Sequence, residues 1–198
     1  MSVFIKICGL RDARCVAAAV DAGADAVGFV FAESVRRVSV EEANAISQDI
    51  PAGVQRVAVM RHPSMQEWQA VLDGFGPDVL QTDAQDFDVL DVPGNVMRWP
   101  VLRQGSARDV AIPTGEYVYE GADSGAGETV DWMQAAAIAK QGRMILAGGL
   151  AAGNIAAAIR AVRPWGIDVS SGVESGPGKK DEALISQFVS VARAAEND

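Results

Sequence analysis

The residues best suited to chemistry lie at the ends of four short apolar runs of the chain. They are a thiol, an amide, a hydroxyl and three carboxylates: Cys8, Gln81, Asp83, Glu120, Asp168 and Ser170. Thiolates and carboxylates serve as general acids and bases in many enzymes. Any one of them is open to the plain reading of a polar residue at a strand end. Six together predict a single site, provided that the fold brings these segments to one face.

Two small-residue segments near the end of the chain predict an anion site. The residues concerned are Gly148, Gly149, Ser170, Ser171 and Gly172. They leave the apolar runs at 144–147 and 166–170. Glycine lets a backbone approach an anion closely, and backbone N–H groups in such loops bind phosphate. Each segment alone reads equally well as a turn, but the pair predicts a phosphate-binding site.

The elements that must position these groups alternate along the chain. Strands are predicted at residues 3–8, 26–31, 55–60, 79–83, 97–103, 117–120, 144–147 and 166–170. Helices are predicted at 12–22, 40–50, 65–75, 131–140, 154–162 and 181–195, with weaker patterns at 86–90 and 105–115. Eight strands with intervening helices predict an α/β fold, a single-domain (β/α)8 TIM barrel over residues 1–198. A doubly wound open sheet shares the alternation and is the alternative.

Within the strands, the side-chain alternation leads to two further predictions. Alternate residues of a barrel strand face the interior, which places Phe4, Lys6 and Cys8 inside. A buried lysine needs a partner, and Asp168 on the last strand is the predicted one. Pro100 predicts an irregular or edge-like position for the fifth strand, because proline lacks the backbone N–H.

Composition limits the partners. The chain has 198 residues, 49% of them apolar, and a net charge of −9. Such acidity excludes a general attraction to nucleic acid or to anionic membranes. No apolar run approaches the ~20 residues that span a bilayer. Cys8 and Cys15 predict free thiols, so we expect a cytoplasmic protein without nucleic-acid or membrane partners.

Residues 6–10 read Lys-Ile-Cys-Gly-Leu, and further distinctive segments lie at 23–31, 34–39, 146–150 with Asn154, 162–174 and 177–181. Together these segments resemble the phosphoribosylanthranilate isomerases of tryptophan biosynthesis. The resemblance implies a TIM barrel that converts N-(5-phosphoribosyl)anthranilate to the 1-deoxyribulose phosphate by an Amadori rearrangement, with no metal or organic cofactor. It also implies Cys8 as general base, which requires some thiolate. Arg36, with Arg37 as a near miss, matches the arginine that pairs with the anthranilate carboxylate.

The general acid is one point of departure from this family. The family usually has an aspartate at the end of the sixth strand, followed by a glycine-rich stretch. Counting back from the glycines at 121–127 places Glu120 at that position. Asp123, three residues further on, is the rival acid.

The fourth strand is the other point of departure. The family commonly has a histidine where this chain has Asp83. We expect Gln81, Asp83 and Asp168 to contact the substrate. His62, the only histidine, follows the third predicted strand, and we expect a surface residue without a catalytic role.

Other functions remain as alternatives. One is an isomerase of the related histidine-pathway aminoaldose, or an enzyme that acts on both substrates. Those enzymes use paired aspartates at the first and fifth strands; this chain has Cys8 and Arg103 there, which argues against them. A non-catalytic phosphate-binding barrel would have lost its acid at position 120. In every case the expected partner is a small sugar phosphate, bound by a monomer or a homodimer.

Overall fold

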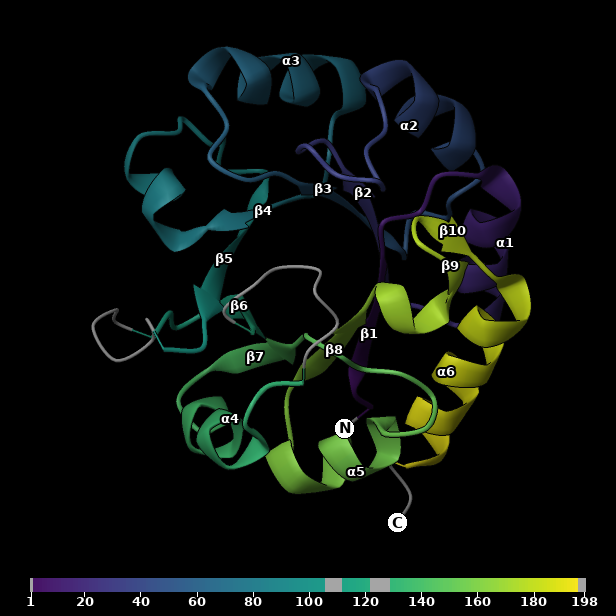
Figure 1. Ribbon diagram of the computed structural model, residues 1–198. Coiled ribbons are helices and arrows are strands. Elements are labelled where there is room, and N and C mark those ends of the chain that lie inside the picture. Colours follow the sequence, from purple (N-terminus) through teal and green to yellow (C-terminus); the bar gives the residue numbers. More distant parts are fainter. Residues whose placement is uncertain (1, 106–111, 122–128, 196–198) are drawn as a thin grey trace.

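The strands form a closed, parallel eight-stranded barrel in the computed structural model, which describes residues 2–105, 112–121 and 129–195 (Figure 1). They are β1 (Phe4–Cys8), β2 (Ala26–Val30), β3 (Gln55–Val59), β4 (Val79–Asp83), β5 (Met97–Arg103), β6 (Glu116–Glu120), β7 (Arg143–Leu146) and β8 (Gly166–Val169). Each strand pairs with the next, and β8 pairs with β1 to close the ring. Closure confirms the predicted barrel and excludes the doubly wound sheet, which would leave two strand edges unpaired.

Helices cover the outside of the barrel. They are α1 (Ala13–Ala22), α2 (Val40–Ser47), α3 (Met65–Phe75), α4 (Trp132–Ala139), α5 (Ile155–Val162) and α6 (Glu182–Ala194). The weak pattern at 86–90 corresponds to a short 3₁₀ turn over Ala84–Asp88. The weak pattern at 105–115 falls largely outside the described residues, and its described part is not helical.

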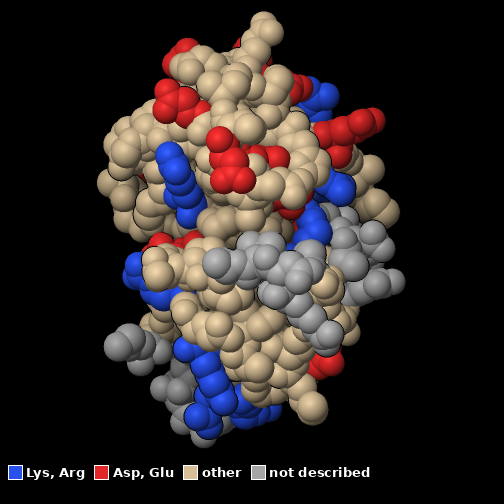
Figure 2. Space-filling view, turned by 90° about the vertical axis from the view of Figure 1, so that its left-hand side faces the viewer, with Lys and Arg blue, Asp and Glu red and all other residues tan. Residues whose placement is uncertain are grey.

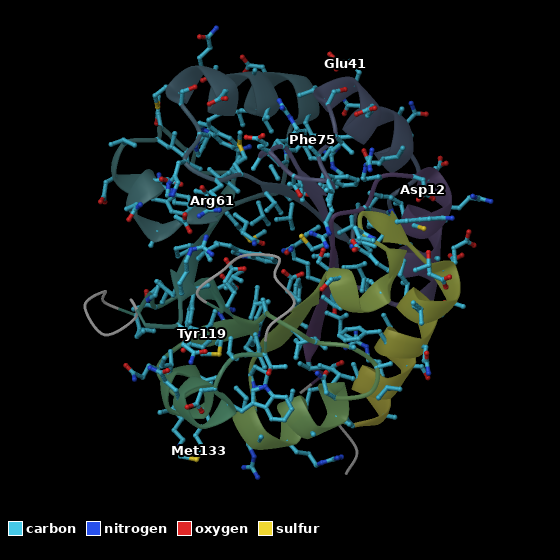
Figure 3. All side chains as sticks on the ribbon, viewed as in Figure 1. Asp12, Glu41, Arg61, Phe75, Tyr119 and Met133 are labelled. Atoms are coloured by element: carbon cyan, nitrogen blue, oxygen red, sulfur yellow. The ribbon has the colours of Figure 1, made fainter. Side chains whose placement is uncertain are left out.

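Apolar side chains pack in two layers, as the alternation within each strand requires. One layer lies between strands and helices: Phe75 of α3 is buried there, whereas Glu41 and Met133 point away from the barrel (Figure 3). The other layer fills the barrel interior. At the N-terminal end of the strands, the Phe4 ring stacks on Trp165, with centroids 4.7 Å apart, and meets Trp99 edge-on at 5.6 Å. These rings close that end, so the interior is accessible from the other end.

Of the irregular or edge-like position predicted for the fifth strand, the edge-like alternative is wrong. β5 pairs with β4 on one side and with β6 on the other. The Met97 N–H faces β4 and the Gln104 N–H faces β6, so the nitrogen of Pro100 also faces β6 by alternation. Pairing with β6 begins only at Val101. A proline is therefore tolerated in a central strand, because it lies just before that ladder begins.

A small hairpin follows β8 and was not anticipated from the sequence. β9 (Glu174–Gly176) pairs antiparallel with β10 (Lys179–Lys180) and lies beside α1 (Figure 1). The surface shown in Figure 2 carries both acidic and basic side chains among uncharged ones. Among the described residues, no helix has the length and apolar character needed to cross a membrane.

Candidate active site

A cavity of about 220 Å³ lies at the C-terminal ends of the strands. Ten of the eleven residues predicted for the site line it: Cys8, Arg36, Gln81, Asp83, Glu120, Gly148, Gly149, Asp168, Ser170 and Ser171. The eleventh, Gly172, packs directly behind, where a Cβ atom would lie 1.9 Å from the Leu150 carbonyl oxygen. Active sites of TIM barrels occupy this same face. The fold thus brings the predicted residues together.

Cys8 ends β1 with its side chain directed into the barrel, and it is buried as a free thiol. The neighbouring β2 residue is Gly28, at which a Cβ atom would lie 3.1 Å from Cys8 Sγ and 3.2 Å from Lys6 Nζ. The absence of a side chain at Gly28 therefore provides the space in which thiol and ammonium meet. Burial raises the pKa of Cys8 and outweighs the positive charges of Lys6 and Lys180, which act in the opposite direction.

Lys6 forms the predicted ion pair with Asp168. Lys6 Nζ donates to Asp168 Oδ1 at 3.0 Å, and the two residues are direct partners in the β1–β8 pairing. Burial alone would lower the pKa of Lys6, but Asp168 and Cys8 outweigh it, so the pKa is raised and the ammonium persists. A permanent positive charge beside Cys8 is the feature that favours a thiolate there.

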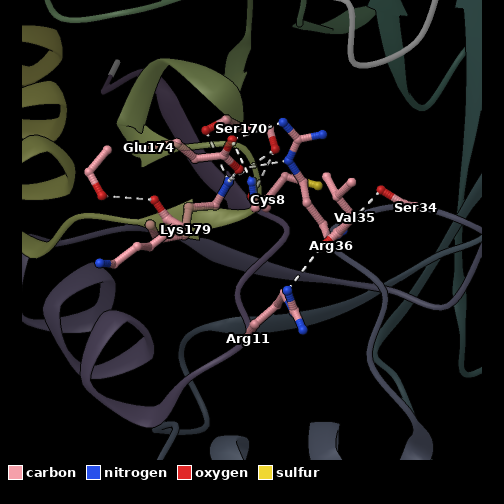
Figure 4. Close-up of polar contacts among 11 residues, drawn as sticks. Cys8, Arg11, Ser34, Val35, Arg36, Ser170, Glu174 and Lys179 are labelled. Atoms are coloured by element: carbon pink, nitrogen blue, oxygen red, sulfur yellow. Dashed lines mark hydrogen bonds and ion pairs between the residues drawn. The ribbon is translucent and has the colours of Figure 1, made fainter.

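Arg36 lies at the cavity edge in the loop between β2 and α2, and its guanidinium binds Glu174 of β9 (Figure 4). Lys180 Nζ also donates to Glu174, at 2.6 Å. Burial alone would raise the pKa of Glu174, but Arg36 and Lys180 together lower it to about 2. Arg37 lines a different groove, between α2 and α3, so of these two neighbouring arginines Arg36 is the one that lines the cavity. The sequence reasoning missed Glu174 and Lys180 as site residues.

Glu120, at the end of β6, lines the opposite side of the cavity and accepts a hydrogen bond from Arg103 of β5. Arg103 Nη2 also donates to Asp83 Oδ1 at 2.6 Å. The sequence did contain a signal for Arg103, because it is a basic residue at an inward-facing position at the end of the fifth strand. From the sequence, this residue served only as an argument against another isomerase. The rival acid, Asp123, lies outside the described residues.

His62 is half exposed, as a surface residue should be, yet it contacts the site. Its Nε2 lies 3.1 Å from Asp83 Oδ2 and its Nδ1 lies 3.0 Å from Asp86 Oδ1. Two carboxylates and an imidazole at such spacing are a possible metal-ligand set. Both imidazole nitrogens already face a carboxylate, so the ring links the loop after β3 to β4 and to the 3₁₀ turn that follows β4.

Gln81 of β4 is buried at the cavity wall, and its Oε1 has no hydrogen-bond partner among the described residues. A buried polar atom without a partner costs free energy unless a ligand or water supplies one. An unpaired acceptor at the cavity wall suits a residue that accepts a hydrogen bond from a substrate hydroxyl.

The loops after β7 and β8 meet at one side of the mouth. Gly148 and Gly149 both have positive φ, at 94° and 59°, a conformation that suits glycine. Asn154 ties this turn together, because its Nδ2 donates to the Gly149 carbonyl at 2.8 Å and its Oδ1 accepts from Ala151 N at 2.9 Å. On the facing loop a 3₁₀ turn begins at Ser171. Phosphate sites of TIM barrels use these two loops.

The closed barrel, the cavity at the strand ends and the paired glycine loops are the architecture of (β/α)8-barrel enzymes, many of which bind phosphorylated small molecules at these loops. A family model described as N-(5'-phosphoribosyl)anthranilate (PRA) isomerase matches residues 5–191. The chain belongs to this family of isomerases of tryptophan biosynthesis.

Individual relatives agree. The isomerase of Listeria monocytogenes (strain HCC23) is 36% identical over 206 residues, covering 98% of this chain and all of the relative. The crystal structure of the Thermotoga maritima isomerase superposes with a TM-score of 0.82 at 28% identity, covering 97% of this chain and 99% of that one. A phosphoribosylanthranilate isomerase crystallised with reduced 1-(o-carboxyphenylamino)-1-deoxyribulose 5-phosphate has a TM-score of 0.79 at 28% identity, with the same coverage. The T. maritima enzyme is described as dimeric, and monomers generated from it have been crystallised.

Proposed function

We propose that this isomerase converts N-(5-phosphoribosyl)anthranilate to 1-(2-carboxyphenylamino)-1-deoxyribulose 5-phosphate, with Cys8 as general base and Glu120 as general acid. The observation that carries the assignment is the placement of a thiol beside a buried ammonium and of a carboxyl group on opposite walls of one cavity. An aldose–ketose rearrangement needs one group that gives a proton and another that takes one.

In the first step, Glu120 donates a proton to the furanose ring oxygen, and the bond from that oxygen to C1 breaks. The electron pair on the anthranilate nitrogen forms the C1=N bond of a Schiff base. Glu120 has to carry a proton at this moment, and Arg103 competes for the same carboxyl oxygen. The step therefore depends on how Arg103 is shared between Glu120 and Asp83.

In the second step, the Cys8 thiolate takes the proton from C2, and the electron pair moves toward the nitrogen to give an enolamine. Return of a proton to C1 and loss of the hydroxyl proton at C2 yield the ketose, so no net redox change occurs. Lys6 stabilises the thiolate through its charge, while Asp168 keeps Lys6 in place. The nitrogen of the substrate serves as electron sink, so the reaction as proposed uses no cofactor.

Binding groups follow from the same arrangement. Arg36 binds the anthranilate carboxylate, and the loops with Gly148, Gly149, Ser170, Ser171 and Gly172 bind the phosphate. Gln81 and Asp83 contact the sugar or the ring from the opposite wall, and Asp168 completes the floor beside Cys8. The orphan Oε1 of Gln81 supports this role.

The protein acts in the cytoplasm as one catalytic domain over residues 1–198, either as a monomer or as a homodimer, without nucleic-acid or membrane partners. The dimeric T. maritima relative supports the homodimer as a genuine option. Light scattering coupled to size-exclusion chromatography distinguishes the two states.

The test of the function is turnover. N-(5-phosphoribosyl)anthranilate is formed in situ, and loss of anthranilate-type fluorescence after addition of the protein reports product formation. We expect loss well above the uncatalysed background. A protein that binds the substrate without accelerating this loss is instead a non-catalytic phosphate-binding barrel.

A further inference from the structure

The guanidinium of Arg36 is oriented by a single carboxylate. Arg36 Nε donates to Glu174 Oε1 at 2.7 Å, and Nη2 donates to Oε2 at 3.0 Å. This bidentate contact uses the Nε edge of the planar group. The other edge, the fork of Nη1 and Nη2, is the one left to meet a ligand.

Glu174 is itself held firmly. Its side chain is 4% exposed, and Lys180, at 1%, donates to Oε1 at 2.6 Å. The backbone N–H of Gly178, in the turn of the β9–β10 hairpin, donates to Oε2 at 3.2 Å. Two cations surround one carboxylate, so the group as a whole carries a net charge of about +1. That charge attracts an anion, although the chain as a whole is acidic.

The hairpin also fixes the backbone that carries Arg36. A Cβ atom at Gly178 would lie 2.7 Å from the Val35 carbonyl oxygen, so the two loops are in direct contact. Arg11 donates to the same oxygen at 2.9 Å (Figure 4). The residue before Arg36 is thus fixed through its backbone, while Arg36 is fixed through its side chain.

From this geometry we infer that Glu174 is a specificity-determining positioning residue, which aims the Arg36 fork so that the site selects a substrate whose aromatic amine bears a carboxylate. The inference rests on the proposed function, in which Arg36 binds that carboxylate. Glu174 acts only through Arg36. Its loss should therefore weaken recognition of the carboxylate and leave recognition of the sugar phosphate unchanged.

The experiment measures two affinities by titration calorimetry. One probe is the reduced product, reduced 1-(o-carboxyphenylamino)-1-deoxyribulose 5-phosphate, and the other is the same compound without the ring carboxylate. The variants are Glu174→Gln, which removes the negative charge, and Glu174→Asp, which keeps a carboxylate to pair with Lys180 but shortens the side chain so that it no longer reaches Arg36 in the same way. The control is Glu182→Gln, an equal charge change at an exposed position on α6.

Wild type should prefer the carboxylated probe. Glu174→Gln and Glu174→Asp should weaken that probe about tenfold, the order of one strong charge-assisted contact, and leave the other probe within twofold. In turnover, KM should rise by a similar factor while kcat stays within about twofold. Glu182→Gln should change none of these quantities.

Two kinds of failure are distinguishable. Equal weakening of both probes, or of neither, overturns the inference while leaving the isomerase intact, and so does a wild type that binds the two probes equally well. Failure of wild type both to bind the carboxylated probe and to turn over the substrate overturns the proposed function, and the inference with it. Glu174→Asp guards against misfolding of the Gln variant, because it leaves the buried Lys180 paired.

Discussion

The two sides of the cavity are both built from charged side chains, but they differ in burial. On the β1–β8 side, the side chains of Lys6 and Asp168 are 0% and 8% exposed. On the β3–β6 side, His62 is 50% exposed and Arg103 is 19% exposed. Removing one partner of a buried pair is costly, whereas an exposed pair contributes ~0–1 kcal/mol. Asp83 is nearly as buried as Asp168, so the difference lies in the cations. The side that carries the Cys8 base has a fully buried ammonium, whereas the side that carries the Glu120 acid has a partly exposed guanidinium and imidazole, which can rearrange more easily.

This difference matches where the chain departs from its family. Both departures expected from the resemblance, Glu120 in place of an aspartate and Asp83 in place of a histidine, lie on the side whose cations are partly exposed. Arg103 contacts both of these carboxylates, so one cation accommodates the two changes together. The following predictions test whether the base side is as inflexible, and the acid side as adaptable, as their burial indicates.

The largest effect should come from Cys8→Ala. Loss of the general base should lower kcat by about 10³-fold, with the melting temperature nearly unchanged, because a small side chain replaces another of similar shape. Stopped or continuous fluorescence assays measure kcat. Cys15→Ala is the matched control, since it removes the other buried thiol, on α1 and away from the cavity. Retention of near wild-type activity by Cys8→Ala would refute its role as the base.

Glu120→Gln should be the next largest, with kcat lowered by about 10²-fold to 10³-fold. The amide keeps the shape of the side chain and a contact with Arg103, but it cannot donate the proton. Asp123→Asn is its counterpart and should leave most activity. An active Glu120→Gln together with an inactive Asp123→Asn would transfer the acid role to Asp123.

Low pH should lower the unfolding free energy through Glu174, whose pKa is lowered to about 2 in the folded protein. A carboxylate with a depressed pKa stabilises the fold above its unfolded pKa, and this contribution is lost as pH falls through the folded pKa. Between pH 5 and pH 2, wild type should lose on the order of 3 kcal/mol of unfolding free energy that Glu174→Gln does not lose. Urea denaturation across this range measures it, and parallel curves for the two proteins would contradict the prediction.

Gly28→Ala tests whether catalysis depends on the present positions of Cys8 Sγ and Lys6 Nζ. A methyl group there has to displace Cys8 Sγ or Lys6 Nζ, so kcat should fall by about tenfold while KM changes little. Gly53→Ala, where a Cβ atom meets nothing within 4 Å, controls for loss of a glycine. Unchanged kinetics in Gly28→Ala would show that the thiol and ammonium do not need their present positions.

The smallest effect should follow His62→Asn. Asparagine tolerates the positive φ of 46° at this position, so the backbone should persist. Loss of the contacts to Asp83 and Asp86 should lower kcat two- to fivefold and cost about 1 kcal/mol or less in stability. Parallel measurement of kcat and of urea unfolding tests this prediction. A loss as large as that of Glu120→Gln would mean that the acid side is no more adaptable than the base side.

The sequence predicted the barrel and most of the site because both depend on local patterns. Alternation within each strand placed Lys6, Cys8 and Asp168 inside, and the order of strands brought β1 and β8 together. The short hairpin escaped, since strands of three and two residues carry no measurable periodicity. Pro100 misled because its effect depends on which neighbouring strand its nitrogen faces.

The site residues that the sequence did not predict were missed for a different reason. Glu174, Lys180 and Arg103 act as partners of other charged groups, and such a partnership depends on the reach of side chains between different elements of the fold. Arg36 and Glu174 are separated by 138 positions. Nothing in the local pattern around either residue indicates the other.

The aromatic rings at the N-terminal end of the barrel close the cavity on that side. Within the described residues, Phe4, Trp99 and Trp165 fill the N-terminal end of the barrel, so the reactant enters and its ketose leaves through the cavity mouth at the C-terminal ends of the strands. A new substrate molecule can therefore bind only after the product has left the cavity. Accumulated ketose should accordingly compete with the reactant for the empty enzyme, and no intermediate can pass through the barrel axis to another catalyst behind it.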